Sequence, residues 1–243
     1  MKISGNKILI TGGASGIGLG LTRRFANEGN KVIICGRRES SLEKVAEELP
    51  GVITRVADLS TAAGRTELFE WIAKQHPDTN VLVNNAGIQQ WMTIEDEDFY
   101  QRAETEIATN IEAPIHLTAM FIKLGSVDTI MNVTSGLSFA PYAKVPVYSA
   151  TKAFLHSFTL SLRHNLKAKG VEVVEIIPPA LNTDLGGKGL HDFAPPVSDF
   201  IDSIFEQLKQ GKTELTFGLS EKAASAGPAE LENIFSALNS SRA

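Results

Sequence analysis

Cysteine is nearly absent from this sequence. Its 243 residues include one cysteine, Cys35, which lies within an apolar run, and five histidines that are scattered along the chain. A single thiol cannot form an intramolecular disulfide, and these residues are not spaced as zinc ligands are. We therefore expect no disulfide framework, no metal site and a reducing compartment.

Long hydrophobic runs and blocks of basic charge are also missing. No apolar stretch approaches the roughly 20 residues that a membrane-spanning helix needs, and residues 1–7 lack the apolar region of a signal peptide. The net charge is −5, and no run of Lys and Arg exceeds two residues. The composition thus argues against nucleic acid and membranes as partners. We expect a globular, cytoplasmic protein.

What is present is a regular alternation of strand-like and helical segments. The strand-like runs are apolar and rich in β-branched residues, and lie at residues 7–11, 31–35, 52–57, 81–83, 129–133, 172–177 and 214–217. The helical periods lie at residues 17–26, 40–48, 61–76, 96–124, 147–168, 198–210 and 228–238. Strands that alternate with helices form parallel sheets covered on both faces. The sequence therefore predicts an α/β fold with a doubly wound parallel sheet of about seven strands, flanked by helices on both faces.

A glycine-rich turn separates the first strand from the first helix. Residues 12–18 read Gly-Gly-Ala-Ser-Gly-Ile-Gly. Backbone N–H groups at such a helix N-terminus approach phosphates closely, and the helix dipole favours the negative charge. The spacing Gly12-x3-Gly16-x-Gly18 differs from the G-x-G-x-x-G dinucleotide fingerprint. The turn alone leaves open whether it binds a phosphate or is only structural.

The end of the second strand bears on the choice of nucleotide. About twenty residues after a glycine turn, an NAD-binding domain places an acid on the ribose, and an NADP-binding domain places an arginine on the 2′-phosphate. Here Gly36 takes the acidic position, and Arg37 and Arg38 follow. A guanidinium binds phosphate through paired, charge-assisted hydrogen bonds. Two alternatives stay open: solvated arginines at a strand end, or Glu39 reaching a ribose from the loop.

Tyr148 and Lys152 are four residues apart in a predicted helix and therefore share one face of it. A nearby positive charge lowers the pKa of a phenol toward the range of a general acid or base. Taken alone, such a pair is more often a ring at the core edge and a solvated amine. Residues 84–87, Asn-Asn-Ala-Gly, follow the fourth strand and form either a simple turn or part of the ligand crevice at the sheet's carboxyl edge.

Together these motifs resemble the short-chain dehydrogenase/reductase family. Thr11-Gly12-x3-Gly16-x-Gly18, Asn84-Asn85-Ala86-Gly87, Ser135 and Tyr148-x3-Lys152 occur in the order and at the intervals of that family, and the resemblance covers about residues 5–184. It implies one NAD(P)-binding Rossmann-fold domain over residues 1–243, with a substrate lid around residues 184–200. The implied activity is hydride transfer between a nicotinamide and a carbonyl or secondary alcohol.

The resemblance also assigns the site residues. The implied catalytic residues are Asn110, Ser135, Tyr148 and Lys152. Tyr148 would exchange the proton, Ser135 would polarise the carbonyl, and Lys152 would lower the pKa of Tyr148 and bind the nicotinamide ribose. Asn110, in a helix bulge, would hold a water that connects Lys152 to solvent. The implied cofactor-binding residues are Gly12, Ser15, Gly16, Ile17, Gly18, Arg37, Arg38, Asp58, Leu59, Asn85, Ala86, Gly87, Tyr148, Lys152, Pro178 and Thr183, with NADP(H) preferred over NAD(H).

One position departs from the family pattern. Family members usually have Pro-Gly at residues 178–179, whereas this sequence has Pro178-Pro179. Pro179 removes a backbone N–H and fixes φ, which puts the geometry of the loop near the nicotinamide in doubt. Thr183 still matches the residue that binds the carboxamide.

The partners implied are a small-molecule carbonyl or alcohol and a second copy of the chain. In the family, helices equivalent to residues 96–124 and 147–168 form a two-fold interface, so we expect a homodimer or homotetramer. The tail and lid also resemble a subgroup labelled DltE, a label that names no substrate. Two alternatives remain: a cofactor-binding regulator or scaffold with little turnover, and a reductase of acyl-carrier-bound substrates, which the lack of basic residues near the lid disfavours.

Overall fold

The computed structural model describes residues 1–240, and its centre is one β-sheet. The strands lie in the order β3-β2-β1-β4-β5-β6-β7, and all neighbouring pairs are parallel. Their bounds are β1 Lys7–Thr11, β2 Lys31–Gly36, β3 Ile53–Val56, β4 Val81–Asn84, β5 Thr129–Val133, β6 Glu172–Ile177 and β7 Glu214–Thr216. The predicted doubly wound sheet is confirmed. The chain builds outward from β1 to β3 and then returns to β4, so the ligand crevice of such a fold lies between β1 and β4.

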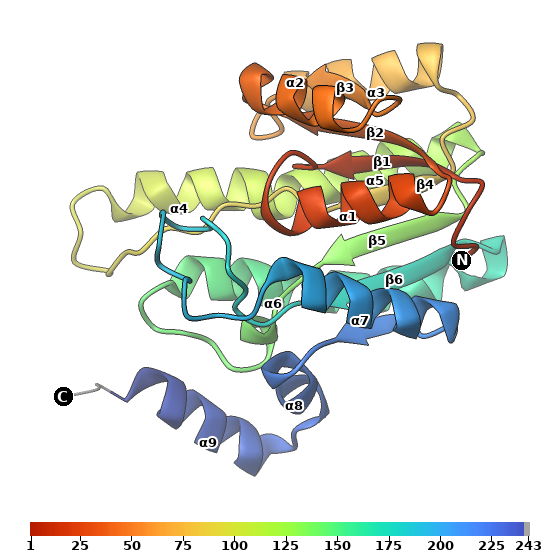
Figure 1. Ribbon diagram of the computed structural model, residues 1–243. Coiled ribbons are helices and arrows are strands. Elements are labelled where there is room, and N and C mark those ends of the chain that lie inside the picture. Colours follow the sequence, from red (N-terminus) through yellow and green to blue (C-terminus); the bar gives the residue numbers. More distant parts are fainter. Residues whose placement is uncertain (241–243) are drawn as a thin grey trace.

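Helices cover both faces of this sheet (Figure 1). They are α1 (Gly16–Asn27), α2 (Glu39–Glu48), α3 (Ala62–Gln75), α5 (Ala113–Phe121), α6 (Pro146–Leu166) and α7 (Val197–Lys209). Helices α1, α2 and α7 enclose one core, in which the rings of Phe25 and Phe205 meet. Helices α3, α5 and the end of α6 enclose the other core, around Leu117 and Phe121. Each helix buries one apolar stripe, as the helical periods in the sequence predict.

The single helix predicted over residues 96–124 is wrong in its detail. Helix α4 (Phe99–Ile107) begins three residues later, and a π-helical turn at Ala108–Glu112 separates it from α5. The late start follows from Asp96, whose carboxylate accepts the N–H and hydroxyl of Thr93 at 3.0 Å each in a turn. The π turn follows from Pro114, because a proline ring clashes with the carbonyl four residues earlier, here that of Asn110. The helix bulge expected at Asn110 is therefore present.

A polar network ties the central strands to the helices behind them. The Asn84 amide donates to Oδ1 of Asn132 (2.8 Å) and to the hydroxyl of Thr118 (3.2 Å), and the Asn132 amide donates to the hydroxyl of Thr159 (2.8 Å). These residues join β4 and β5 to α5 and α6. Because buried amides lose their hydration, these hydrogen bonds favour one register of the two strands, although Oδ1 of Asn84 has no partner within residues 1–240.

The tail contains a helix that the sequence did not indicate. Residues 218–227 are small and polar, and their composition predicts no helix or strand, but they contain α8 (Leu219–Ser225). The buried Ser220 hydroxyl donates to the carbonyl of Ile177 at 2.5 Å and anchors this helix at the end of β6. Helix α9 (Pro228–Asn239) follows and extends away from the sheet in Figure 1.

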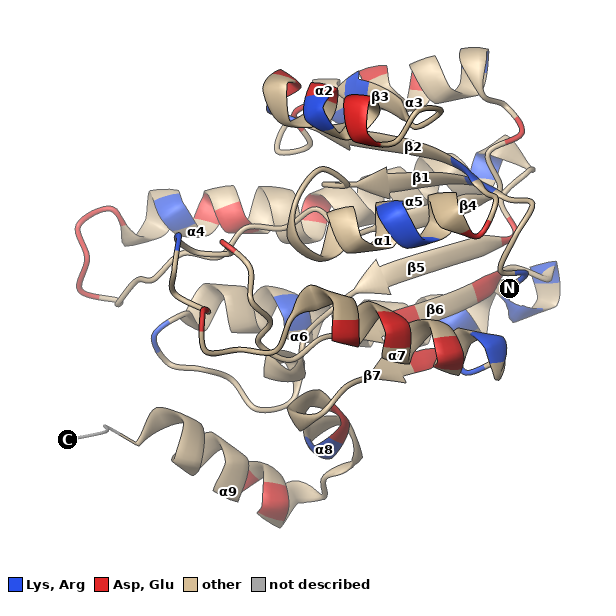
Figure 2. Ribbon diagram, viewed as in Figure 1, with Lys and Arg blue, Asp and Glu red and all other residues tan. Residues whose placement is uncertain are grey.

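The surface of the described part carries both signs of charge. Lys and Arg are interspersed with Asp and Glu over the helices, and acids gather in the loop before α4 and on α7 (Figure 2). None of the helices within residues 1–240 is long and apolar enough to cross a bilayer. Helices α4 and α6 expose Tyr100, Ile107, Phe154 and Leu160. The homodimer or homotetramer stays a prediction.

The packing of α7 on α1 can be tested by removing one ring. Phe205 is fully buried, and its ring centroid lies 4.8 Å from that of Phe25. We expect Phe205→Ala to lower the free energy of unfolding by about 3–5 kcal/mol, because it leaves a cavity that the two helices cannot close. Phe193, which is 83% exposed, provides the control. Phe193→Ala should change the free energy of unfolding by less than about 0.5 kcal/mol. Urea unfolding measures both, and equal effects would contradict this packing.

Candidate active site

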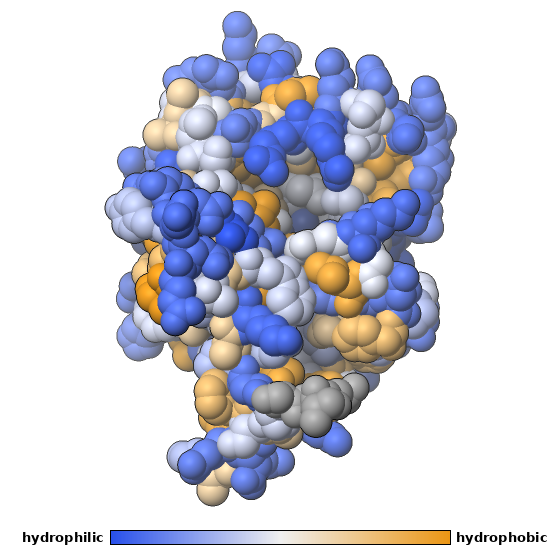
Figure 3. Space-filling model, turned by 90° about the vertical axis from the view of Figure 1, so that its left-hand side faces the viewer, coloured by the Kyte–Doolittle hydropathy of each residue, from blue (hydrophilic) through white to orange (hydrophobic). Residues whose placement is uncertain are grey.

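A cavity of about 680 Å³ lies at the carboxyl edge of the sheet. Figure 3 looks onto this edge, where the surface is hollowed. All the residues predicted to bind the cofactor line it: Gly12, Ser15, Gly16, Ile17, Gly18, Arg37, Arg38, Asp58, Leu59, Asn85, Ala86, Gly87, Tyr148, Lys152, Pro178 and Thr183. The fold thus brings together residues from six separate stretches of the chain.

The glycine turn is held against the loop after β4. The Thr11 hydroxyl accepts the backbone N–H groups of Asn85 and Ala86 at 2.9 Å each, and the Asn85 amide donates to the carbonyls of Thr11 (2.8 Å) and Gly12 (3.2 Å). Gly12 has φ +66°, and a Cβ at Gly18 would lie 2.2 Å from the Gly12 carbonyl oxygen. Only glycine allows this close approach. The turn therefore presents bare backbone to the cavity.

The start of α1 in this turn suits an anion. Its first turn contains no acidic residue, and the hydroxyl of the N-cap residue, Ser15, makes no capping hydrogen bond within residues 1–240. The first N–H groups of a helix have no partner inside the helix, and the dipole makes this end positive. A phosphate group of a dinucleotide fits these conditions.

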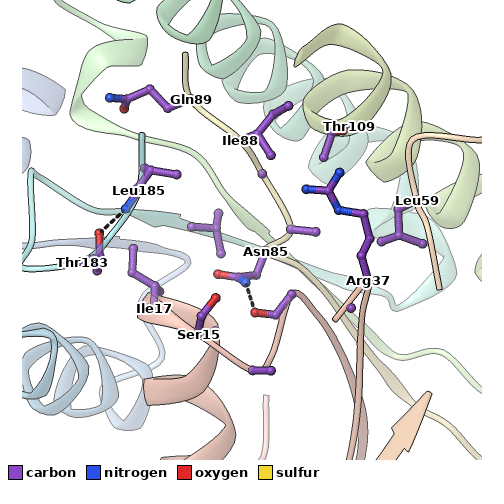
Figure 4. Close-up of a pocket in the computed structure, with 18 of the residues that line it drawn as sticks. Ser15, Ile17, Arg37, Leu59, Asn85, Ile88, Gln89, Thr109, Thr183 and Leu185 are labelled. Carbon is purple, nitrogen blue, oxygen red and sulfur yellow. Dashed lines mark hydrogen bonds between the residues drawn. The ribbon is translucent and has the colours of Figure 1, made fainter. Parts of the chain in front are cut away.

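Two arginines and a serine line the cavity where β2 leads into α2. Arg37 follows β2, Arg38 is the N-cap residue of α2, and Ser41 lies in its first turn; all three line the cavity. Figure 4 shows the Arg37 side chain extending from the end of β2 beside Leu59. Glu39, the acid that the sequence left as an alternative ribose ligand, is not among the lining residues.

Tyr148 and Lys152 lie one turn apart on α6, and both are buried. Nζ of Lys152 donates to the carbonyl of Val133 at 2.8 Å and lies 5.6 Å from the centroid of the Tyr148 ring. Because burial disfavours the charged form, it lowers the pKa of Lys152 to about 8, although the charge of Glu106 opposes the shift. The amine of Lys152 is therefore mostly protonated at neutral pH.

The pKa of Tyr148 is raised, which is opposite to the shift that the sequence predicts. Burial of the phenol is the largest cause, the charge of Glu106 adds to it, and a hydrogen bond with Ser135 opposes it. The prediction considered the lysine alone, whereas loss of hydration disfavours the phenolate more than the ammonium 5.6 Å from the ring favours it. Tyr148 is accordingly a neutral phenol at neutral pH.

Ser135 and Asn110 are buried beside the cavity and are not among its lining residues. The Ser135 hydroxyl accepts the N–H of Leu137 at 3.1 Å and is hydrogen-bonded to Tyr148. The Asn110 amide donates to the carbonyl of Ile88 (2.8 Å) and the hydroxyl of Thr151 (3.1 Å), and its oxygen accepts the Ile88 N–H (2.9 Å). Asn110 therefore clamps the loop after β4 to α6. Its expected role of holding a water stays a prediction.

Gly87 is where Asn110 and Lys152 come close. A Cβ at this glycine would lie 3.3 Å from Oδ1 of Asn110 and 3.5 Å from Nζ of Lys152. The structure thus places the amide oxygen and the ammonium against the same backbone position, where glycine leaves room for both.

The segment after β6 forms one side of the cavity despite Pro179. The Pro178 carbonyl accepts the N–H of Gly136 at 2.9 Å, so the loops after β5 and β6 are joined. Residues 184–196 have no helix or strand, but α7 begins at Val197. The substrate lid around residues 184–200 stays a prediction, and its last four residues form the first turn of α7.

Several lining residues were missed from the sequence. The polar ones are Ser41, Ser60, Gln89, Thr109 and Thr134, and the lid adds residues 184–186. Ser41 and Ser60 follow β2 and β3, and Gln89 follows the Asn-Asn-Ala-Gly motif. Their position just past the carboxyl ends of strands was the available signal, since the crevice of this fold lies there.

Comparison with known proteins decides the family. A family model described as short chain dehydrogenase matches residues 6–192. This chain belongs to the short-chain dehydrogenase family. It is 41% identical to "Uncharacterized oxidoreductase DltE" of Bacillus subtilis (strain 168), over 249 aligned positions that cover 98% of each chain. The resemblance of the tail and lid to the DltE-labelled subgroup thus extends over the whole chain.

More distant relatives show how widely this short-chain dehydrogenase shares its fold. It is 36% identical to "NADP-dependent 3-hydroxy acid dehydrogenase YdfG" of Salmonella typhi, over 176 residues that cover 70% of this chain and 71% of the relative. A solved structure of a short chain dehydrogenase from Burkholderia cenocepacia J2315 in complex with NADP superposes with a TM-score of 0.84 at 23% identity, and covers 98% of this chain and 99% of that one. The protein is accordingly an oxidoreductase with the Rossmann-type fold of its family.

An ion pair lies behind the serine of this short-chain dehydrogenase. Nδ1 of His156, on α6, lies 2.9 and 3.0 Å from the two carboxylate oxygens of Glu175, and Glu175 is fully buried in β6. The hydroxyl of Thr134, next to Ser135, donates to the same carboxylate at 2.7 Å. The hydrogen bond to Glu175 is the largest cause that raises the pKa of His156, against partial burial.

The pair makes stability depend on pH. Because the folded pKa of His156 is raised, its contribution is fully present below the unfolded value of about 6.5 and is lost as pH rises through the folded value. We expect His156→Gln to lower the free energy of unfolding by roughly 1 kcal/mol more at pH 6 than at pH 9, a modest difference because the imidazole is partly exposed. Urea unfolding across pH measures it. His164→Gln, an exposed histidine on the same helix, should show a smaller dependence; a pH-independent His156→Gln difference would refute the pair.

Proposed function

We propose that this protein transfers a hydride between NADP(H) and a carbonyl or secondary alcohol, with Tyr148 as general acid and base. The observation that carries the proposal is the burial of Tyr148 and Lys152 in the wall of the cavity that the glycine turn and Arg37 also line. A phenol and an ammonium are costly to bury, and such groups cluster where chemistry uses them.

The residues that line the cavity suit the successive parts of a dinucleotide. The bare backbone of the glycine turn and the N-terminus of α1 would hold the pyrophosphate, and Arg37, Arg38 and Ser41 would hold a 2′-phosphate. Lys152, Pro178 and Thr183 would lie at the nicotinamide end. When bound, the nicotinamide supplies or accepts the hydride. We infer one NADP(H)-binding domain, with residues 184–196 as the substrate lid.

Proton transfer would fall to Tyr148. In the direction of reduction its phenol gives a proton to the carbonyl oxygen, and the Ser135 hydroxyl donates a second hydrogen bond to that oxygen. The raised pKa of Tyr148 supports this direction, because it keeps the proton in place at neutral pH. Lys152 would bind the ribose and neutralise the phenolate left after transfer.

The substrate class rests on the family. The Salmonella typhi relative is named as a dehydrogenase of 3-hydroxy acids, which carry a CH–OH group, and this supports a small alcohol or carbonyl compound as substrate. The rival is a cofactor-binding regulator that keeps the fold without turnover, and the buried Tyr148 and Lys152 weigh against it.

Tyr148→Phe tests the proton transfer. The change deletes one hydroxyl and keeps the ring, so kcat should fall by about 10²–10⁴-fold while the Kd for NADPH stays within about twofold. Stopped-flow turnover with a panel of carbonyls and fluorescence titration measure the two quantities. Tyr100→Phe, at a 67% exposed tyrosine, is the control. A Tyr148→Phe enzyme that keeps a tenth of the wild-type kcat would refute the assigned role, and a wild type that binds NADPH without turnover would favour the regulator.

Arg37→Ala tests the choice of cofactor. A charge-assisted contact with the 2′-phosphate is worth about 1.5–3 kcal/mol, so the wild type should bind NADPH about 10- to 100-fold more tightly than NADH. Arg37→Ala should remove most of this preference and leave NADH affinity nearly unchanged. Lys44→Ala, at an exposed lysine of α2 outside the cavity lining, is the matched control. Equal affinities in the wild type would overturn the assignment.

A further inference from the structure

Trp91 carries a buried N–H that the proposed function leaves without a partner. Its indole Nε1 is shielded from solvent and makes no hydrogen bond within residues 1–240. The ring packs edge-on against Tyr142, with the centroids 5.7 Å apart and the planes at 89°, so its orientation is fixed. An indole nitrogen only donates, and a buried donor without an acceptor destabilises the fold. This N–H therefore points to a ligand that supplies the acceptor.

A second donor converges on the same point of the structure. A Cβ at Gly186 would lie 3.0 Å from Nε2 of Gln89 and 3.3 Å from Nε1 of Trp91. Gly186 belongs to the segment after β6, and both Gly186 and Gln89 line the cavity. Figure 4 shows Gln89, together with Leu185 and Thr183, on the side of the cavity away from Arg37. Two N–H groups thus meet the cavity where that segment covers it.

The loop that carries both donors is held from behind. The Gln90 N–H donates to Oε1 of Glu106 at 2.5 Å, and the Gln90 amide donates to the carbonyl of Arg102 at 3.0 Å. The Arg102 guanidinium donates to the carbonyl of Trp91. These contacts use Gln90 and the backbone of Trp91, so they leave the Gln89 amide and the indole N–H available. Donors that are fixed before binding lose little freedom when a ligand arrives.

The charges around the two donors disfavour an anionic ligand. Glu106 is 0% exposed and lies behind the loop, and Asp184 lines the cavity in the segment after β6. Within residues 1–240, the Lys and Arg side chains that line the cavity are Arg37, Arg38 and Lys152, which the proposed function assigns to the 2′-phosphate and the ribose. A neutral oxygen accepts hydrogen bonds without adding a charge, so it suits this place better than a carboxylate does.

We propose that Trp91 and Gln89 determine substrate specificity by binding a neutral oxygen that the substrate carries in addition to its reacting carbonyl or hydroxyl. The substrate class is then a keto ester, a diketone or the corresponding hydroxy compound, and not the anion of a keto acid. The inference rests on the proposed function, which places Thr183 and its neighbours at the nicotinamide end of the cavity. A second point of attachment orients the substrate before the hydride moves.

Trp91→Phe tests the contact because it removes the N–H and keeps an aromatic ring beside Tyr142. The measurement is kcat/KM with NADPH for ethyl acetoacetate relative to methyl pentyl ketone, a monoketone of the same chain length. The wild type should prefer the ester, and Trp91→Phe should reduce that preference about 3- to 10-fold, which is the effect of losing one neutral hydrogen bond. Trp71→Phe, in α3 and outside the cavity lining, is the matched control and should leave the preference unchanged.

A binding measurement reports the same contact without turnover. The chain has two tryptophans, so its NMR spectrum contains two indole N–H signals, and Trp71→Phe assigns them. NADP⁺ cannot reduce a ketone, so both compounds can be titrated into the complex with NADP⁺. The Trp91 signal should move downfield with ethyl acetoacetate and much less with methyl pentyl ketone. Gln89→Leu, which removes the other donor, should weaken binding of the ester about 3- to 10-fold.

The outcomes separate this inference from the proposed function. Equal preferences in the wild type and Trp91→Phe, with an indole signal that the ester does not move, would overturn the inference and leave Trp91 as packing for Tyr142. Faster reduction of acetoacetate than of its ethyl ester would also overturn it. A wild type that binds the ester at Trp91 and reduces no ketone would support the contact and refute the proposed function. If Trp91→Phe folds poorly, Gln89→Leu and the wild-type titration decide.

Discussion

The site depends on the hydrogen bonds that join the turn after β1 to the loop after β4. Thr11 and Asn85 form four of them, and they fix two loops from opposite halves of the sheet at the distance that Gly12 and Gly18 permit. Parallel strands require these two loops to lie at the same edge, but the strands alone do not set their separation. The polar contacts do, and both the cavity and the start of α1 follow from that separation.

Farther along the same edge, the protein places ionisable groups where water is scarce. Tyr148, Lys152 and Glu106 are all buried, and each is shifted toward its neutral form by loss of hydration. Burying any one of these charged groups alone would strongly destabilise the fold. The attraction between the ammonium and the carboxylate offsets part of that desolvation penalty. Apolar packing in the two cores, one on each face of the sheet, offsets the rest of this penalty; Phe25 lies in one core and Phe121 in the other.

Sequence and structure agree where a local pattern carries the information. The strand runs, the glycine turn and Tyr148-x3-Lys152 are such patterns, and they predicted the sheet and the lining of the cavity. The sequence failed where the decisive effect was long-range. The raised pKa of Tyr148 depends on its burial, and Glu106 looks like any other acid of an amphipathic helix until the fold buries it. Helix α8 was missed because Ser220, which anchors it, bonds to a carbonyl 43 residues away.

The π turn between α4 and α5 amounts to one additional residue in an otherwise continuous helix. An α-helix rotates about 100° per residue, so the extra residue changes the phase of everything after it. Asn110, within this turn, donates to Thr151 of α6, whereas Leu117 and Phe121, after it, pack in the core beneath the sheet. Deleting one residue from 108–112 would restore the regular helix and turn one of these two sets away from its partner. The length of this short segment is thus constrained from both ends, by the contacts of Asn110 on one side and by the core on the other.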